Sequence, residues 1–220
     1  LNCALVGGET AELPGLYQSD GVDLVGFVVG AVERANLITG LGIGPGDAIL
    51  GVASSGMHTN GYSLARKVFQ VDDSPAALSR YEPSLAMTLG EALLIPHRSY
   101  SGVLTPVLTQ VKALAHITGG GLLENVPRVL PQGLIARFDP ASWTIPPIFN
   151  LIQTEGNITD DEMFRVFNMG VGMILIVDPK EVSSVQAAVP EAMVVGLIEA
   201  ASGPALGPSV EISRVVPKGE

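Results

Sequence analysis

Glycine and proline recur along this chain, so it can form only short helices and strands joined by shaped loops. The 220 residues include 26 glycines and 16 prolines. Valine-rich apolar segments between these breaks predict strands, and segments with apolar residues at helical spacing predict helices. The predicted strands are residues 22–32, 48–53, 133–139, 171–178, 192–199 and 209–216. The predicted helices are residues 62–69, 84–96, 100–115, 122–130, 146–156, 160–167 and 180–189.

Strands and helices mix throughout, which predicts an α/β or α+β fold with mixed sheets flanked by helices. Hydrophobic residues make up 47% of the chain, enough for a sizeable core. The longest apolar stretches, residues 24–32 and 171–177, are well short of the roughly 20 residues that a spanning helix needs. We therefore expect no membrane partner. Residues 36–47 contain four glycines and one proline, which is typical of a crossing between domains.

The charge balance argues against nucleic acid as a partner. The chain has 12 Lys and Arg against 22 Asp and Glu, a net charge of −10, so a broad basic surface is not expected. Any anionic ligand must be held locally.

Cys3 is the only cysteine, which excludes an intrachain disulfide and a cysteine-based zinc site and fits a reducing compartment. We expect a cytoplasmic protein.

The first candidate site is the loop "SSGMHTNG" (54–61), which leaves a predicted strand and enters a predicted helix. The first amides of such a helix carry partial positive charge and suit a phosphate. Gly56 and Gly61 let backbone approach a ligand, Asn60 can cap the helix, and His58 can donate or accept a proton near neutral pH. The structural alternative is a capped turn with a solvent-exposed histidine.

The loop "HITGGG" (116–121) repeats this design, with His116 before three consecutive glycines. Such glycines cost folding entropy, so either a phosphate or another segment of the protein must approach the backbone closely. Strand-against-helix packing is the alternative. A third loop, "FNMGVGM" (167–173), contains Asn168, which is a weak candidate by itself because Gly170 is typical of a helix C-cap.

Three other polar residues have structural alternatives. Glu9 and Glu12 can bind magnesium through their carboxylates, or can form a solvated acidic turn. His97, beside Arg98 where a helix is predicted to stop, is interpreted as a surface residue. No P-loop, dinucleotide-binding "GxGxxG" or Ser-His-Asp order is found, so the usual kinase and Rossmann explanations of glycine do not apply.

Four motifs together carry a family resemblance. "GGETAELPGLY", "SSGMHTNGYSLAR", "HITGGGLLENVPRVLP" and "FNMGVGM", in this order between residues 7 and 173, closely resemble aminoimidazole ribonucleotide synthetase, the phosphoribosylformylglycinamidine cyclo-ligase of purine biosynthesis. The N-terminal part of the family, which carries much of the ATP site, has no counterpart here. The resemblance implies two α/β domains and a homodimer formed through the N-terminal one. Residues 1–40 would end that domain, and residues 41–220 would form the C-terminal domain.

The resemblance also implies a reaction. Enzymes of the family convert formylglycinamidine ribonucleotide and ATP into aminoimidazole ribonucleotide, ADP and phosphate, with Mg²⁺ as the metal. ATP phosphorylates the formyl oxygen, and an amidine nitrogen of the substrate then closes the imidazole ring. Two alternatives stay open: a non-catalytic module that binds a ribonucleotide, and another ATP-using member of the superfamily, such as thiamine-phosphate kinase or selenophosphate synthetase.

The resemblance assigns residues to three groups, each on a matching motif. The catalytic group is His58, Asn60 and His116. The substrate- and phosphate-binding group is Ser55, Gly56, Gly61, Thr118, Gly119, Gly120, Gly121 and Asn168. The nucleotide-binding group is Gly7, Gly8, Glu9 and Thr10, with Glu9 also the metal ligand. One position departs from the family, which usually has threonine in place of His97, and this leaves the role of Arg98 open.

Overall fold

The computed structural model describes residues 3–16, 21–201 and 207–213, and the chain divides into two units, Leu1–Leu37 and Ile38–Glu220. The described part of the first unit contains one 3-10 helix, η1 (Arg34–Asn36), an isolated bridge residue at Pro14 followed by a turn, and otherwise irregular backbone. In the described residues of both units, no helix has the length and apolar character that a membrane span requires.

The predicted strand at residues 22–32 is wrong in this structure, because these residues are irregular and exposed. Leu24 is fully exposed and Phe27 is 92% exposed. A strand exists only where a neighbour pairs its backbone N–H and C=O groups, and no strand in the described part of the chain pairs with this segment.

The second unit contains a six-stranded sheet in the order β4-β6-β1-β7-β5-β8. β5 and β8 are parallel and every other neighbouring pair is antiparallel, so the predicted mixed sheet is confirmed. Its strands are β1 (Ala48–Ala53), β4 (Val111–His116), β5 (Leu134–Phe138), β6 (Val171–Val177), β7 (Met193–Ala200) and β8 (Ser209–Ile212). A two-stranded sheet pairs β2 (Tyr81–Glu82) with β3 (Met87–Thr88).

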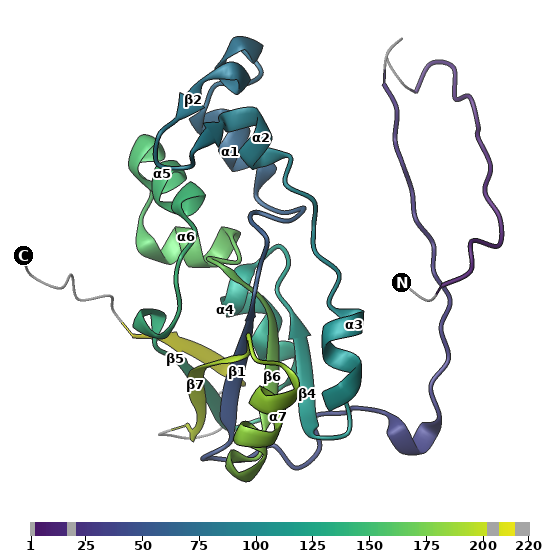
Figure 1. Cartoon of the computed structure of the whole chain (residues 1–220), viewed down its shortest axis with the longest axis vertical. Coiled ribbons are helices and arrows are strands. Elements are labelled where there is room, and N and C mark those ends of the chain that lie inside the picture. The colour runs from purple at the N-terminus through teal and green to yellow at the C-terminus, as the bar shows by residue number, and fades with distance from the viewer. Residues whose placement is uncertain (1–2, 17–20, 202–206, 214–220) are drawn as a thin grey trace, which may run out of the picture. The chain divides into compact units, whose positions relative to one another are not determined.

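Helices cover both faces of the six-stranded sheet, as predicted. In β1 the side chains alternate, with Ile49 in one buried cluster and Leu50 and Val52 in the other. The first cluster contains residues of α1 (Tyr62–Val68), α2 (Leu89–Leu93), α4 (Gly121–Asn125), α5 (Pro147–Gly156) and α6 (Asp160–Val166), and the second contains residues of α3 (Ser101–Leu104) and α7 (Val182–Ala188). Figure 1 shows α1, α2 and α5 grouped towards one end of this sheet. The loop after β1 leads into this group through α1.

Two predicted helices need correction. Residues 100–115 form α3, the 3-10 helix η3 (Thr105–Val107) and then β4, because residues 111–116 pair with β6 and bury alternate side chains. The predicted helix at 84–96 shortens to α2, since residues 87–88 pair in β3 and Thr88 with Glu91 forms a capping box.

The remaining predicted elements are present with small changes at their ends. The 122–130 segment divides into α4 and the 3-10 helix η4 (Val126–Val129), with Pro127 in its first turn. Three further 3-10 helices are η2 (Pro75–Ser79), η5 (Pro140–Ser142) and η6 (Pro179–Glu181). The predicted strand 209–216 ends at Ile212, and residues 214–216 lie outside the described residues.

Candidate active site

The loop 54–61 begins where β1 ends, and its own polar groups hold His58 inward. The Ser55 amide donates to His58 Nε2 at 3.1 Å. The Ser55 hydroxyl donates to the Pro96 carbonyl at 2.8 Å and accepts from the Arg98 amide at 3.2 Å. His58 adopts a left-handed conformation, with φ 58°, and only 2% of the residue is exposed. The alternative of a solvent-exposed histidine in this loop is therefore wrong.

The start of α1 differs from the prediction that Asn60 caps it. Gly61 occupies the N-cap position with φ 80°, and no side chain caps the helix. A Cβ on Gly61 would collide with the Phe167 ring, so this glycine allows the third loop to pack against the first. The Asn60 side chain instead lies beside Gly119, since a Cβ added to Gly119 would stand 3.4 Å from Asn60 Oδ1. The loops 54–61 and 116–121 therefore meet at Asn60 and Gly119.

The three glycines of "HITGGG" have different surroundings. A Cβ on Gly121 would collide with the Phe164 carbonyl of α6, and Gly121 has φ 56°. A Cβ on Gly120, which has φ 94°, would lie 2.6 Å from the Glu124 Cβ. Around Gly119, only the Asn60 oxygen lies within 4 Å of an added Cβ among the described residues. Packing therefore accounts for Gly120 and Gly121, whereas the backbone of Gly119 is open.

Asn125 holds this glycine loop in shape, and the sequence analysis missed it. Its Nδ2 donates to the carbonyls of Gly121 at 2.8 Å, Gly119 at 3.1 Å and Thr118 at 3.4 Å. Its Oδ1 accepts from the Thr118 hydroxyl at 3.1 Å, and Asn125 is 5% exposed. One feature of the sequence could have indicated it: Asn125 lies in the mostly apolar segment "LLENV". A side-chain amide that is buried in such a segment needs hydrogen-bond partners.

Asn168 links the third loop to the first. Its Nδ2 donates to the Gly56 carbonyl at 2.9 Å. Its Oδ1 accepts from the Gly170 amide at 2.8 Å and from the Ser54 hydroxyl at 2.9 Å. Asn168 is only 2% exposed. These internal bonds give Asn168 a positioning role between the two loops.

His97, interpreted above as a surface residue, lies between the other two histidines. Its ring stacks on His58 with centroids 3.8 Å apart, and its Nε2 is 3.2 Å from His116 Nε2. One ring nitrogen of each residue lies within 4.8 Å of the others. We call His58, His97 and His116 the histidine cluster. The sequence indicated only His58 and His116. His97 was missed because no local pattern shows that residues 94–100 fold over the loop after β1.

His58 and His116 favour the neutral imidazole. Burial, followed by repulsion from His97, His116 and Arg98, lowers the pKa of His58 from 6.5 to about 4. Burial and His97 also lower the pKa of His116. Since His58 Nε2 accepts from an amide, the proton of neutral His58 is on Nδ1, which is buried and has no hydrogen-bond partner among the described residues.

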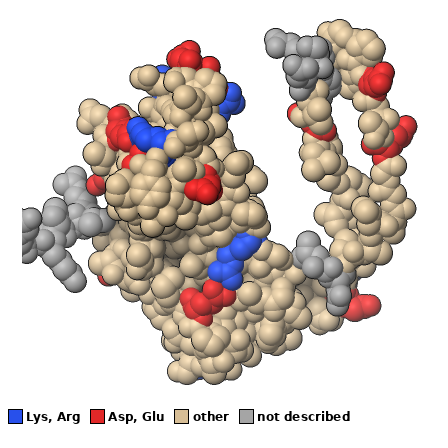
Figure 2. Space-filling view, turned by 45° about the horizontal axis from the view of Figure 1, so that its top comes forward, with Lys and Arg blue, Asp and Glu red and all other residues tan. Residues whose placement is uncertain are grey.

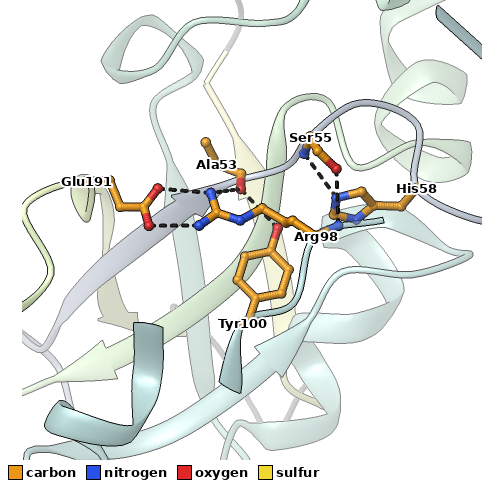
Figure 3. A network of polar contacts seen from close by, with 6 residues as sticks. All are labelled: Ala53, Ser55, His58, Arg98, Tyr100 and Glu191. Atoms are coloured by element: carbon orange, nitrogen blue, oxygen red, sulfur yellow. Dashed lines mark hydrogen bonds and ion pairs between the residues drawn. The ribbon is translucent and has the colours of Figure 1, made fainter. Parts of the chain in front are cut away.

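Arg98 and Tyr100 fix the point where β1 becomes the loop (Figure 3). Arg98 Nη1 donates to the Ala53 carbonyl at 3.1 Å, and the Tyr100 hydroxyl donates to the same oxygen at 2.9 Å. The Arg98 guanidinium also binds both carboxylate oxygens of Glu191, at 2.8 and 2.9 Å. The sequence left the role of Arg98 open. In the structure, Arg98 holds the end of β1 in place by linking the Ala53 carbonyl to Glu191.

The predicted nucleotide segment lies in the first unit. Gly7, Gly8, Glu9 and Thr10 are exposed and irregular. Among the described residues, the histidine cluster is the only group of three or more potential metal ligands. Glu9 is not part of such a group among the described residues.

Charged side chains on the face in Figure 2 lie in small mixed groups, and no broad basic area is visible on its described residues. Several basic groups of the second unit are paired, including Arg98 with Glu191 and Lys112 with the buried Asp47. This arrangement agrees with the net charge of −10.

Comparison with known proteins identifies the family. Residues 44–207 match the family model described as AIR synthase related protein, C-terminal domain. The chain belongs to this family. It is 52% identical over 182 residues to the phosphoribosylformylglycinamidine cyclo-ligase of Caldicellulosiruptor bescii, covering 82% of this chain and 53% of that protein. It is 48% identical over 205 residues to the enzyme of the same name from Lachnospira eligens, covering 90% of this chain and 60% of that protein.

The chain spans about half the length of these curated relatives. A solved structure, the thiamine-monophosphate kinase from Stenotrophomonas maltophilia K279a, superposes with a TM-score of 0.50 at 15% identity. The match covers 82% of this chain and 54% of that chain. This likeness confirms the α/β fold class, and both relatives above are named phosphoribosylformylglycinamidine cyclo-ligase.

Proposed function

We propose that this chain forms the substrate-facing part of an ATP-dependent cyclo-ligase that makes aminoimidazole ribonucleotide from formylglycinamidine ribonucleotide. One observation carries the proposal: two loops far apart in sequence converge, with His58 and His116 nitrogens within 4.8 Å and Asn60 beside Gly119. Family membership and the names of the relatives support the same reaction.

The reaction places modest demands on the protein. ATP transfers its γ-phosphoryl group to the formyl oxygen, and the amidine nitrogen then forms a bond to the same carbon. The phosphorylated oxygen departs as phosphate, and the nitrogen loses a proton. Such a reaction needs the nitrogen and carbon to be held in contact and needs donors near the developing charge.

Differences in exposure divide the proposed roles. His116 is exposed, and we assign it, together with Asn60, to the reacting amide and its proton. His58 is buried and supports the loop through the Ser55 amide, so it is assigned as a positioning residue. The open backbone of Gly119 lets a ligand oxygen approach.

The phosphate-binding groups are proposed to lie on the same loops. They comprise the hydroxyls of Ser55 and Thr118 and the backbone of Gly56, Gly61, Gly119, Gly120 and Gly121, with Asn168 supporting them. ATP and Mg²⁺ are assigned to Gly7, Gly8, Glu9 and Thr10 on the resemblance alone. Cytoplasmic location, a homodimer and the boundary near residue 40 are proposed on the same basis.

Calorimetry with formylglycinamidine ribonucleotide and Mg-ATP, combined with an assay of ADP release, tests this function on the purified chain. We expect both ligands to bind and His116→Ala to lower the rate of ADP release by roughly 10²–10⁴-fold if His116 transfers a proton. Thr59→Ala, an exposed change in the same loop, is the matched control and should leave the rate unchanged.

The other outcomes separate the alternatives. Ribonucleotide binding without ADP release would favour the non-catalytic binding module. ATP turnover without ribonucleotide binding would favour another enzyme of the superfamily. A chain that binds neither ligand would refute the assignment of these loops as a nucleotide site.

A further inference from the structure

All three histidines of this chain lie in one cluster, although they come from three separate segments. His58 lies in the loop after β1, His97 lies between α2 and α3, and His116 ends β4. We propose that the histidine cluster binds one divalent transition-metal ion, with Zn²⁺ as the reference ion.

The donor atoms determine the class of metal. Neutral imidazole nitrogens suit Zn²⁺, Co²⁺, Ni²⁺ and Cu²⁺, whereas Mg²⁺ and Ca²⁺ require oxygen ligands. The nearby Arg98 charge is paired with Glu191, which reduces its repulsion of a cation.

Two of the rings already have a suitable separation. Tetrahedral Zn²⁺ with Zn–N bonds of about 2.0–2.1 Å places two ligand nitrogens about 3.3–3.4 Å apart. His97 Nε2 and His116 Nε2 are 3.2 Å apart. Without a metal, this contact is a hydrogen bond that requires one ring to donate a proton to the other. An ion would replace that shared proton with two metal–nitrogen bonds.

His58 completes the site after one adjustment. Its Nε2 accepts from the Ser55 amide and its ring stacks on His97, so the ring must turn away from both to share an ion. The turn breaks the bond from the Ser55 amide, whereas the buried Nδ1 has no partner among the described residues and so no bond to lose. His97 is partly exposed and His116 is exposed, which leaves room for water as a fourth ligand.

An ion in the cluster would occupy the lone pair of His116 and so inhibit ring closure, a consequence that rests on the proposed function. The binding itself can be tested without any activity assay.

The composition of the chain makes the binding test specific. It has three histidines, all in the cluster, and one cysteine, Cys3, which is exposed. Tag-free protein carrying Cys3→Ser would be titrated with Zn²⁺ in a calorimeter, with Mg²⁺ as the control ion. We expect one Zn²⁺ per chain and no comparable binding of Mg²⁺.

The matched variant is His97→Thr, which removes one ligand, on a partly exposed loop, and keeps the other two. Loss of even an outer-shell partner weakens metal sites about 10–100-fold, so we expect at least a tenfold lower Zn²⁺ affinity. X-ray absorption at the zinc edge should count three imidazole ligands, which tests His58 without mutating it.

Unchanged affinity in His97→Thr, a count of two or fewer imidazoles, or no saturable Zn²⁺ binding would each overturn the metal site. Those results would leave the proposed cyclo-ligase intact, because ring closure needs no ion at the histidines. Conversely, Zn²⁺ binding by a chain that binds neither ribonucleotide nor ATP would keep the metal site and remove the proposed function.

Discussion

Replacing Asn168 with alanine should destabilise the second unit more than any change to the surface of the site. The Asn168 amide bonds to three groups: the Gly56 carbonyl, the Gly170 amide and the Ser54 hydroxyl. The first two bonds are buried, so the alanine variant leaves a carbonyl and an amide without partners inside the protein.

The structure sets the size of this effect. A buried polar group left unpaired costs about 1–3 kcal/mol, and two such groups remain in the variant. Ser54 is only partly buried, so water can reach one side of the site and lower the cost. We therefore expect the free energy of unfolding to fall by about 2–4 kcal/mol. Ser54→Ala, which removes only the third bond, should cost about 0.5–1.5 kcal/mol.

The single tryptophan provides the assay, because it reports on the same loop. Trp143 is 7% exposed and its Nε1 donates to the Met169 carbonyl, one residue after Asn168. Urea unfolding followed by Trp143 fluorescence would give the midpoint and slope for the wild type and both variants. If Asn168→Ala costs no more than Ser54→Ala, the buried bonds to Gly56 and Gly170 do not hold the two loops together.

Two further predictions concern single contacts. Gly121→Ala should lower the free energy of unfolding, measured in urea, by at least about 1–2 kcal/mol. Alanine is strained at φ 56°, and its Cβ would collide with the Phe164 carbonyl. Gly119→Ala, the control, should be nearly neutral in the same measurement. The hydrogen bond from Arg98 lowers the pKa of Glu191 below its unfolded value of 4.5. The ionised carboxylate therefore stabilises the fold above pH 4.5, and this stabilisation is lost as the pH falls through the lower pKa of the folded state. Glu191→Gln should therefore cost about 0.2–1 kcal/mol at neutral pH and nothing in acid, and a constant cost at both pH values would contradict the ion-pair account.

Local sequence predicted an element where burial and local preference agree. Residues 48–53 were predicted as a strand and form β1 over the same residues, because both faces of an apolar, valine-containing segment are buried. Residues 111–116 failed this rule. "VKALAH" contains good helix formers, but pairing with β6 overrides that preference. A single sequence cannot show the partner strand, which lies some 60 residues away along the chain.

The candidate site shows the same limit. The glycines and two of the histidines are visible in local motifs, so the three loops could be identified. His97, Tyr100 and Glu191 could not, because each reaches the site from a segment whose own sequence carries no signal. Their contribution depends on how residues 94–100 cross the end of β1, which is a property of packing.

The surroundings of each loop glycine show whether packing within the chain accounts for it. Gly61 and Gly121 are needed because ring and carbonyl atoms of the chain itself occupy the space of a side chain. A ligand is not required to explain them. Gly119 differs, since its backbone faces open space beside the Asn60 oxygen. Packing does not explain a glycine at this position, and the ligand contact proposed for Gly119 and Asn60 uses this open backbone within an otherwise structural loop.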